Sequence, residues 1–299
     1  MKKLIVLFAS ILMCTFAQAQ TTIHVMWPFS ISSSDSVMVR SLIDGANSQQ
    51  TKYRFVFLSK QGAGGTVAAS YVHDNPDNHV LISSSSFYVR PMLYKESHDP
   101  EKFAMVGAVC NGKPLAIFSK KYVTVKDIGT NEFTVGINSG SITQLVSRGL
   151  KNNSNIKVLE IPYKGTPEAT VDMLGGHLDG SVDFIGISTF AKFPATAKVN
   201  VLGITGTVSQ PRLPTFKSQG VSGLDYLTAN YSIFVSSVVP VQIQQELNQI
   251  FNLAVNQGVR DNCEEDYGKI VKVPYSQTVK LHQEAIAYWR KITTGMSKE

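Results

Sequence analysis

The chain has 299 residues, of which 43% are hydrophobic and 17% are charged, and its formal net charge is +6. This length predicts one large domain or two smaller ones, with enough chain to bury sizeable cores. The mild basicity without any run of Lys or Arg argues against a nucleic-acid-binding protein and suits an anionic ligand.

The first nineteen residues have the pattern of an export signal. Met1-Lys2-Lys3 precedes a short apolar stretch over 4–16, which is followed by Ala17-Gln18-Ala19. A basic start, an apolar centre and a small-x-small end predict a cleavable signal peptide, with cleavage after Ala19 and delivery to the periplasm. The apolar stretch falls short of the roughly 20 residues that span a bilayer. The alternative is a core helix at the start of the chain.

Strand-like and amphipathic segments then alternate in two successive series. The first series predicts strands at Ile23–Pro28, Tyr53–Leu58, Val80–Ser84, Ala104–Cys110 and Leu115–Ser119, with helices at Asp35–Asn47 and Thr66–His73. The second predicts strands at Phe133–Ile137, Lys157–Ile161, Asp183–Ile185 and Val199–Ile204, with helices at Ile142–Leu150 and Pro167–Leu174. Such alternation is typical of mostly parallel sheets flanked by helices. Two series predict two similar α/β lobes.

The remaining chain predicts how the lobes are joined. A strand at Tyr231–Ser236 precedes two segments with helical apolar spacing, Val241–Gly258 and Ser276–Thr293. We expect these helices to return to the first lobe. Lobe one then comprises residues 20–117 and 231–299, and lobe two residues 118–230. Leu115–Ser119 and Tyr231–Ser236 are the expected crossings.

Five predicted turns that lead from a strand toward a helix are rich in Ser, Thr and Gly. They cover residues 27–35, 62–66, 83–86, 139–144 and 163–168. Ligands of open α/β sheets bind beyond the carboxyl ends of the strands, where helix N-termini offer free N–H groups. Each turn alone is as readily an ordinary helix start. Together they predict a cleft lined with neutral hydrogen-bond donors, which suits a small carboxylate.

Individual residues refine three of these turns. Ser34 or Asp35 is expected to cap the first helix, and Ser141 with Gln144 has capping-box spacing. Thr166 is expected at the N-cap with Pro167 at the first helical position. The positive charges nearest to the turns are Lys60 and Lys164.

Several other patterns point away from catalysis and metal binding. Residues 107–113 match the start of a phosphate-binding loop, but Pro114 replaces the hydroxyl residue that holds magnesium. The six histidines lack metal-ligand spacing. Ser141 is the best candidate nucleophile for an exported hydrolase, yet none of the five turns contains a histidine. The acidic cluster over 264–266 is expected on a solvated helix face, and pairing of Cys110 with Cys263 stays open.

At the turns the sequence resembles the Bug-type extracytoplasmic solute receptors of tripartite tricarboxylate transporters. The resemblance rests on Gly62-Ala63-Gly64-Gly65-Thr66, on Ile161-Pro162-Tyr163-Lys164-Gly165, and on the later Met173-Leu174-Gly175-Gly176-His177-Leu178-Asp179. Shorter supporting pieces are Asn75-Pro76-Asp77, Ser139-Gly140-Ser141 and Leu213-Pro214-Thr215-Phe216. The resemblance covers about residues 23–260.

This resemblance implies a two-lobed periplasmic binding protein (type II) that holds its ligand in the interlobe cleft. It implies a non-catalytic monomer without cofactor or metal, a small carboxylated metabolite as ligand, and a membrane permease of one small and one large subunit as partner. A sensor protein in place of the permease is the alternative. The turns and the resemblance together predict these ligand-binding residues: Phe29, Ser30, Ser32, Ser33, Ser34, Asp35, Gly62, Ala63, Gly64, Ser84, Ser85, Ser139, Gly140, Ser141, Thr143, Tyr163, Lys164, Gly165 and Asp183.

The first turn departs from the pattern of this family. Ile31, Ser32 and Ser33 stand where the family carries Pro-Gly-Gly, and Ser36 replaces an Asp. We expect the serine hydroxyls to take the place of ordered waters and to favour a shorter or differently branched acid. The alternative is a different turn, because Ser disfavours the positive φ that Gly adopts freely.

Overall fold

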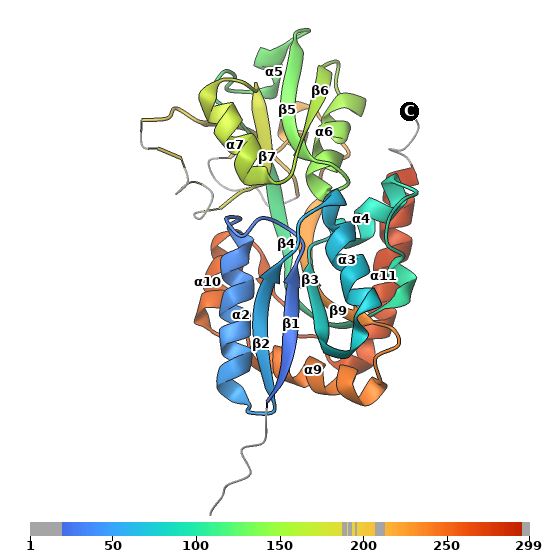
Figure 1. Ribbon diagram of the computed structural model, residues 1–299. Helices are drawn as coiled ribbons and strands as arrows, with labels where there is room; N and C mark the ends of the chain where they lie inside the picture. Colours follow the sequence, from blue (N-terminus) through green and yellow to red (C-terminus); the bar gives the residue numbers. More distant parts are fainter. Residues whose placement is uncertain (1–19, 187–189, 191–192, 195, 207–212, 295–299) are drawn as a thin grey trace, which may run out of the picture.

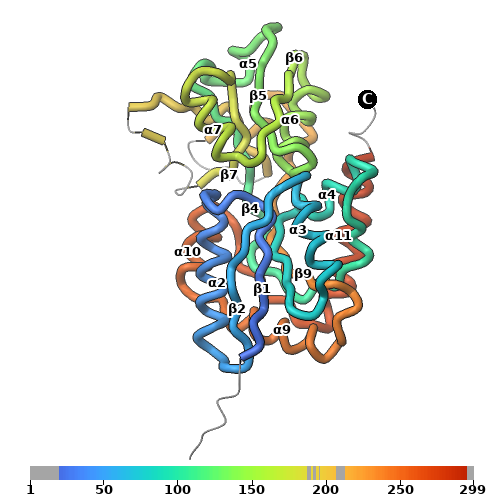
Figure 2. The backbone as a smooth tube through the Cα atoms, in the orientation of Figure 1, coloured from blue at the N-terminus to red at the C-terminus, as the bar shows by residue number. Residues whose placement is uncertain are grey.

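The computed structural model describes residues 20–186, 190, 193–194, 196–206 and 213–294 (Figures 1 and 2). The predicted signal peptide at 1–19 and its cleavage site lie outside the described residues. Within the described part of the chain, no helix combines the length and the apolar character that a membrane crossing requires.

The first lobe is built on a sheet with the strand order β2-β1-β3-β9-β4. Strand β1 lies parallel to both β2 and β3, whereas β9 runs antiparallel to β3 and β4. Figure 1 shows helices α2 and α10 to one side of this sheet and α3, α4 and α11 to the other. The bounds are β1 Thr21–Trp27, α2 Asp35–Gln49, β2 Tyr53–Ser59, α3 Thr66–Asp74, β3 His79–Ser83, α4 Ser86–Leu93, β4 Phe103–Ser119, β9 Thr228–Ser236, α9 Val241–Leu253, α10 Gln257–Glu265, β10 Lys269–Ile270 and α11 Tyr275–Thr294.

The second lobe continues from the far end of β4, in the order β4-β7-β5-β6. Strand β5 is parallel to β6 and β7, and β4 pairs antiparallel with β7 and β8. The bounds are α5 Val125–Ile128, β5 Glu132–Asn138, α6 Ile142–Asn152, β6 Lys157–Tyr163, α7 Thr166–Gly175, β7 Gly180–Phe184 and β8 Asn200–Ile204. The predicted fold class of two α/β lobes flanked by helices is confirmed. The sheets are mixed rather than mostly parallel, because β4 and β9 pair antiparallel with their neighbours.

Strand β4 belongs to both lobes. It pairs with β9 up to Pro114 and with β7 from Leu115 onward, so one continuous strand of 17 residues crosses between the sheets. The prediction of two separate strands was wrong. The polar Asn111-Gly112 step resembles a turn, but it forms an irregularity in the β4–β9 register, with Gly112 at a φ of 80°. A bulge of this kind bends a strand without ending it.

The C-terminal region also differs from the prediction. The helix expected over Val241–Gly258 ends at Leu253, and α10 begins at Gln257. Between the two helices, the side chain of Asn256 caps the start of α10 by accepting a hydrogen bond of 3.1 Å from the Val259 amide. Of the acidic cluster, Asp266 is fully buried rather than solvated.

A disulfide joins the crossing strand to this C-terminal region. Cys110 of β4 and Cys263 of α10 are bonded, their Cα atoms lie 5.9 Å apart, and neither side chain is exposed. The bridge therefore fixes the end of α10 against the middle of β4, although the two cysteines are 153 residues apart in the sequence.

Helix α4 is anchored in the first lobe through a buried histidine. His98 packs on the ring of Phe87 with centroids 4.8 Å apart, and its Nε2 contacts the Phe87 carbonyl oxygen at 2.8 Å. Burial disfavours the charged imidazolium and lowers the pKa of His98 to about 4.

This pKa predicts acid sensitivity. Because the unfolded chain binds a proton near pH 6.5 and the folded chain only near pH 4, the contribution of neutral His98 is complete above about 6.5 and is lost as the pH falls toward 4. The loss amounts to about 3 kcal/mol at most. Urea unfolding between pH 4 and 7 should show a shallower pH dependence for His98→Gln. His177→Gln, at an exposed histidine, is the control and should follow the wild type. Equal slopes for all three proteins would contradict the assignment.

Candidate functional site

A cavity lies between the two lobes, at the carboxyl ends of β1, β3 and β5; we call it the inner cavity. Its empty volume, including the mouth, is about 420 Å³. Its lining combines aromatic side chains with small hydroxyl and amide groups. The lining residues are Trp27, Phe29, Ser30, Ser33, Asp35, Ser84, Ser86, Asn138, Ser141, Ile142, Thr143, Thr166, Pro167, Phe184 and Tyr231.

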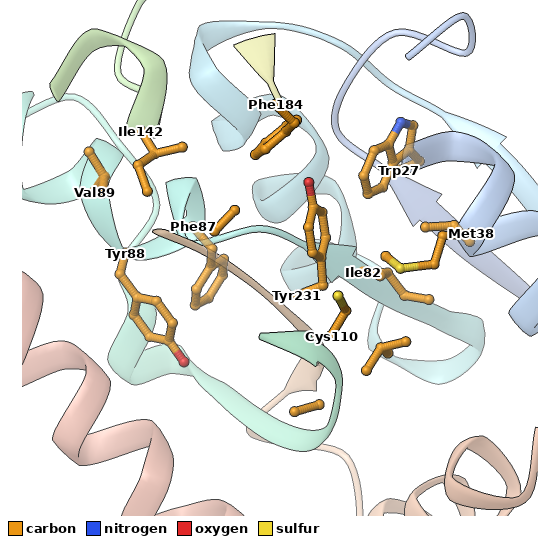
Figure 3. Packing of buried hydrophobic residues seen from close by; sticks show 14 of the residues in the cluster. Trp27, Met38, Ile82, Phe87, Tyr88, Val89, Cys110, Ile142, Phe184 and Tyr231 are labelled. Carbon is orange, nitrogen blue, oxygen red and sulfur yellow. The ribbon is translucent and has the colours of Figure 1, made fainter. Parts of the chain in front are cut away.

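Aromatic rings form the floor of the inner cavity. The ring of Tyr231 is stacked on that of Trp27 at a centroid distance of 6.2 Å and lies equally far from Phe184 in a tilted arrangement. Figure 3 shows the Tyr231 ring between the other two. Trp27 ends β1, Phe184 ends β7 and Tyr231 lies inside β9. Trp27 and Tyr231 are almost completely buried. The floor therefore offers a rigid apolar surface to a small ligand.

A buried charge network supports this floor. The Lys113 ammonium, which is not exposed at all, pairs with the carboxylate of Asp35 and, at 2.8 Å, with that of Asp266. The Tyr231 hydroxyl donates to the other oxygen of Asp35 at 2.5 Å. Burial alone would lower the pKa of Lys113, but the two carboxylates outweigh it and raise the pKa above the usual value. Lysine thus stays charged, and Asp35 is held in place from two sides.

The wall opposite the floor is the start of α6. Its first amides are already hydrogen-bonded within the protein: Ile142 N–H donates to Ser86 Oγ at 3.1 Å, and Thr143 N–H to Ser141 Oγ at 3.2 Å. Gln144 N–H donates to the Ser141 carbonyl oxygen at 3.1 Å. A ligand in this structure therefore meets hydroxyl groups at this helix rather than free N–H groups.

Helices α4 and α6 contact each other across the lobe interface. Arg90 of α4 stacks on Tyr94, 3.8 Å from the ring centroid, and donates from Nη1 to the Ser139 carbonyl oxygen at 3.2 Å. The Tyr94 hydroxyl donates to Gln144 Oε1 at 3.0 Å. These bonds join the two lobes directly, and we call this set the α4–α6 contact.

Gly140 is essential to this contact. A Cβ atom there would lie 2.1 Å from Arg90 Cδ, and the φ of 78° already disfavours other residues. We expect Gly140→Ala to open the lobes and to weaken ligand binding about tenfold, corresponding to about 1.4 kcal/mol. Calorimetry with a ligand found by screening measures this effect.

Gly176→Ala is the matched control for Gly140→Ala. Gly176 has nearly the same φ, 81°, but a Cβ there would meet no atom within 4 Å. Backbone strain is therefore common to both variants, and only Gly140→Ala disturbs the interface. If both variants bind with wild-type affinity, the α4–α6 contact does not contribute to binding.

A second, more open cavity adjoins the first, and we call it the outer cavity. It is lined by Pro28, Gly62, Ala63, Gly64, Gly65, Asn138, Ser139, Pro162, Tyr163 and Lys164. The glycine-rich turn approaches the second lobe closely, since a Cβ on Gly64 would lie 2.6 Å from the Ser139 carbonyl oxygen. Asn138 lines both cavities and donates to the Lys164 carbonyl oxygen at 3.2 Å.

The predicted site residues fall into three groups. Those that line the inner cavity are Phe29, Ser30, Ser33, Asp35, Ser84, Ser141 and Thr143. Those that line the outer cavity are Gly62, Ala63, Gly64, Ser139, Tyr163 and Lys164. Ser32, Ser34, Ser85, Gly140, Gly165 and Asp183 line neither cavity.

Some of the residues outside both cavities make hydrogen bonds or ring contacts within the protein. Ser32 is exposed and bonds to Ser30 Oγ at 2.8 Å, whereas Ser85 is buried and accepts from the Asn230 amide at 3.0 Å. The Nζ atom of Lys60, expected near the cleft, lies 4.2 Å from the ring centroid of Tyr71.

The helix-cap predictions are partly corrected. Ser141 caps α6, but Gln144 does not complete a capping box, because its side chain accepts from the Gly140 amide at 2.7 Å. Helix α7 already includes Thr166, so Gly165 is its N-cap residue. Ser34 precedes α2 in a helical conformation without a side-chain cap.

Sequence reasoning missed the residues Trp27, Ser86, Asn138, Ile142, Thr166, Pro167, Phe184 and Tyr231 as lining of the inner cavity. Most of them lie beside a predicted residue or inside a predicted turn. For Phe184 the available signal was its position at the carboxyl end of a strand, beyond which α/β sheets bind ligands. Tyr231 lies inside β9 and carries no such signal.

Solved structures of similar architecture include a periplasmic binding protein and two proteins with bound carboxylates. BugD, a periplasmic binding protein, superimposes with a TM-score of 0.82 at 19% identity, over 94% of this chain and 99% of the other. The R. palustris protein Rpa4515, solved with adipate, has a TM-score of 0.78 at 20% identity, over 94% and 98%. MatC from Rhodopseudomonas palustris, with bound malate, has a TM-score of 0.76 at 20% identity, over 91% and 98%. At these identities the similarity shows the fold.

The sequence itself identifies the family. The family model described as the tripartite tricarboxylate transporter family receptor matches residues 38–297, which is most of the chain and includes both lobes. The resemblance to Bug-type receptors is thereby confirmed. The protein belongs to the receptors of the tripartite tricarboxylate transporter family and is a solute-binding receptor of this kind.

Proposed function

We propose that this receptor captures a small carboxylate in the inner cavity and delivers it to a membrane permease with one small and one large subunit. The observation that carries the proposal is the cavity itself: a small space closed between two lobes, with aromatic rings on one side and hydroxyl and amide groups on the other. Ligand sites of this composition bind the apolar body and orient the polar end of a small molecule. Adipate and malate, bound by two proteins of the same fold, are small carboxylates.

The proposal includes the organisation of the chain. Residues 20–117 and 231–299 form lobe one and 118–230 form lobe two, which is supported by the change of pairing partner within β4 at Pro114 and Leu115. The first segment directs export and is then removed by cleavage after Ala19, as its basic start and its small residues indicate. The protein acts as a monomer and needs neither a metal nor a cofactor for binding.

We also propose that the receptor is not an enzyme. The hydroxyl of Ser141, the best candidate nucleophile, donates to the Asn138 carbonyl oxygen at 2.8 Å. Among the described residues, no histidine lines the inner cavity. A serine hydrolase needs a base within hydrogen-bond reach of its nucleophile.

A thermal-shift screen tests the proposed function. A ligand that binds only the folded protein raises the midpoint of unfolding, and the shift grows with ligand concentration. We expect at least one small carboxylate to raise the midpoint and its uncharged amide to have no effect. Succinate with succinamide is one such matched pair. Equal shifts for acids and amides, or no shift with any acid, would show that the cavity does not recognise carboxylates.

A further inference from the structure

Most hydroxyl protons around the inner cavity are already used within the protein. A hydroxyl group has one proton to donate and two lone pairs that accept. Ser33 donates to the Ser30 carbonyl oxygen at 2.7 Å, and Ser84 donates to Ser86 Oγ at 3.1 Å. Ser141 donates its only hydroxyl proton to the Asn138 carbonyl oxygen. In the bond of 2.7 Å between Ser141 Oγ and Thr143 Oγ1, the threonine is therefore the donor. These groups can only accept a hydrogen bond from a ligand.

The polar atoms at the floor of the cavity are also acceptors. The Tyr231 hydroxyl gives its proton to Asp35, and burial together with that carboxylate raises the pKa of Tyr231 well above 10. The phenol therefore stays protonated, and its proton stays directed at Asp35. The indole N–H of Trp27 donates to the Ser30 carbonyl oxygen at 3.2 Å. What the floor offers to a ligand is the phenol oxygen of Tyr231 and, beside it, a carboxylate.

Two of the donors that remain for a carboxylate, at Ser86 and Asn138, lie beside the start of α6. Ser86 Oγ accepts from the Ile142 amide and from Ser84, so its own proton is available. The side-chain amide of Asn138 uses one hydrogen on the Lys164 carbonyl oxygen and keeps the other. The inner cavity is therefore polarised, with donors at Ser86 and Asn138 and acceptors at Tyr231 and Asp35.

From this polarity we infer that the ligand is an acid that also carries a hydrogen-bond donor, an ammonium or a hydroxyl group, which binds the Tyr231 phenol oxygen. The inference rests on the proposed function and narrows its ligand class. An acid without such a donor would place only C–H groups against acceptors that they cannot satisfy. An amino or hydroxy acid satisfies both walls at once.

Three acids with the same carbon skeleton test the inference. Succinate, malate and aspartate differ only in a hydrogen, a hydroxyl or an ammonium group at one carbon. Titration calorimetry of the full mature chain should give malate or aspartate at least about tenfold tighter binding than succinate, the effect of one good hydrogen bond. Comparison of malate with aspartate shows which donor is preferred. Succinate binding as tightly as both would overturn the inference.

Tyrosine variants locate the effect. Tyr231→Phe keeps the ring but removes the acceptor. The affinity of the better of malate and aspartate, divided by that of succinate, should therefore fall to about 1. Tyr275→Phe is the matched control, because it also removes one hydroxyl bond, 2.8 Å to Gln244 Oε1, at the start of α11 and outside both cavities. Its affinity ratio should equal that of the wild type. A wild-type ratio retained in Tyr231→Phe would contradict the assignment to the phenol oxygen.

The outcome separates the inference from the proposed function. If none of the acids binds and a wider carboxylate screen also gives no ligand, the proposed function fails. If succinate or another unsubstituted acid binds as well as its substituted relatives, only the inference about the donor fails. Should Tyr231→Phe not fold, the three wild-type affinities alone decide the inference.

Discussion

Lys113→Met should lower the free energy of unfolding by about 3–5 kcal/mol, as expected when one partner of a buried ion pair is removed. Methionine fills nearly the same volume as the lysine stem, so the loss is electrostatic rather than a cavity effect. The variant takes the ammonium away from the Asp35 and Asp266 carboxylates, both of which are buried. Urea unfolding at pH 7 measures the change.

Lys121→Met serves as the control for this prediction. Lys121 also pairs with a carboxylate, that of Asp179 at 2.7 Å, but its side chain is 60% exposed. Exposed pairs contribute at most about 1 kcal/mol. If Lys113→Met unfolds at the same urea concentration as Lys121→Met, the buried network does not stabilise the fold. Because Asp35 also holds Tyr231, Lys113→Met should in addition weaken ligand binding.

Removal of the disulfide should have the second-largest effect. We expect Cys110→Ala together with Cys263→Ala to lower the free energy of unfolding by about 2–5 kcal/mol, because the bridge closes a long loop in the unfolded chain. The bridge spans 153 residues and includes the whole second lobe. Urea unfolding of the oxidised wild type and the double variant provides the comparison.

Reduction provides an independent check on the disulfide prediction. Reductant added to the unfolded wild type should bring its refolding free energy to that of the double variant. A difference between oxidised and reduced protein below about 1 kcal/mol would mean that the packing of α10 on β4 persists without the bond. Either result also shows how far Asp266, three residues after Cys263, depends on the bridge for its place beside Lys113.

Local sequence signals were sufficient for most elements of the fold. Helix α2 begins at Asp35 and helix α6 at Ile142, both as predicted, because a hydroxyl-rich turn precedes an amphipathic segment in each case. The continuity of β4 could not be predicted in this way. Asn111-Gly112-Lys113 resembles a polar turn, and Lys113 is buried only because Asp35 and Asp266, 78 and 153 residues away, neutralise it.

The candidate site was predictable to a similar extent. The five turns led to the hydroxyl groups of both cavities, since turn composition is local. The aromatic floor was not found, because Trp27 and Tyr231 look like ordinary core residues of strands. Both face the inner cavity only because β1 and β9, which come from different parts of the sequence, lie in the same sheet. The hydrogen bond from the Ile142 amide of α6 to Ser86 Oγ is likewise a contact between the lobes, which local sequence does not indicate.

For the serine-rich first turn too, the sequence did not show how the side chains are used. Its residues adopt no positive φ, since Ala63 and Tyr267 are the only non-glycine residues with one in the described part of the chain. Ser33 lines the inner cavity, and its proton is used on the Ser30 carbonyl oxygen. The hypothesis that these serines favour a shorter or differently branched acid stays a prediction.

A crystal structure of the mature protein with its tightest-binding acid would show whether the inner cavity is the binding site. We expect the acid between the lobes in the inner cavity, with its carboxylate within hydrogen-bond distance of Ser86 or Asn138 and its body against the rings of Trp27 and Tyr231. An acid bound outside the cleft, for example in the groove beside Phe103 and His282, would contradict this expectation.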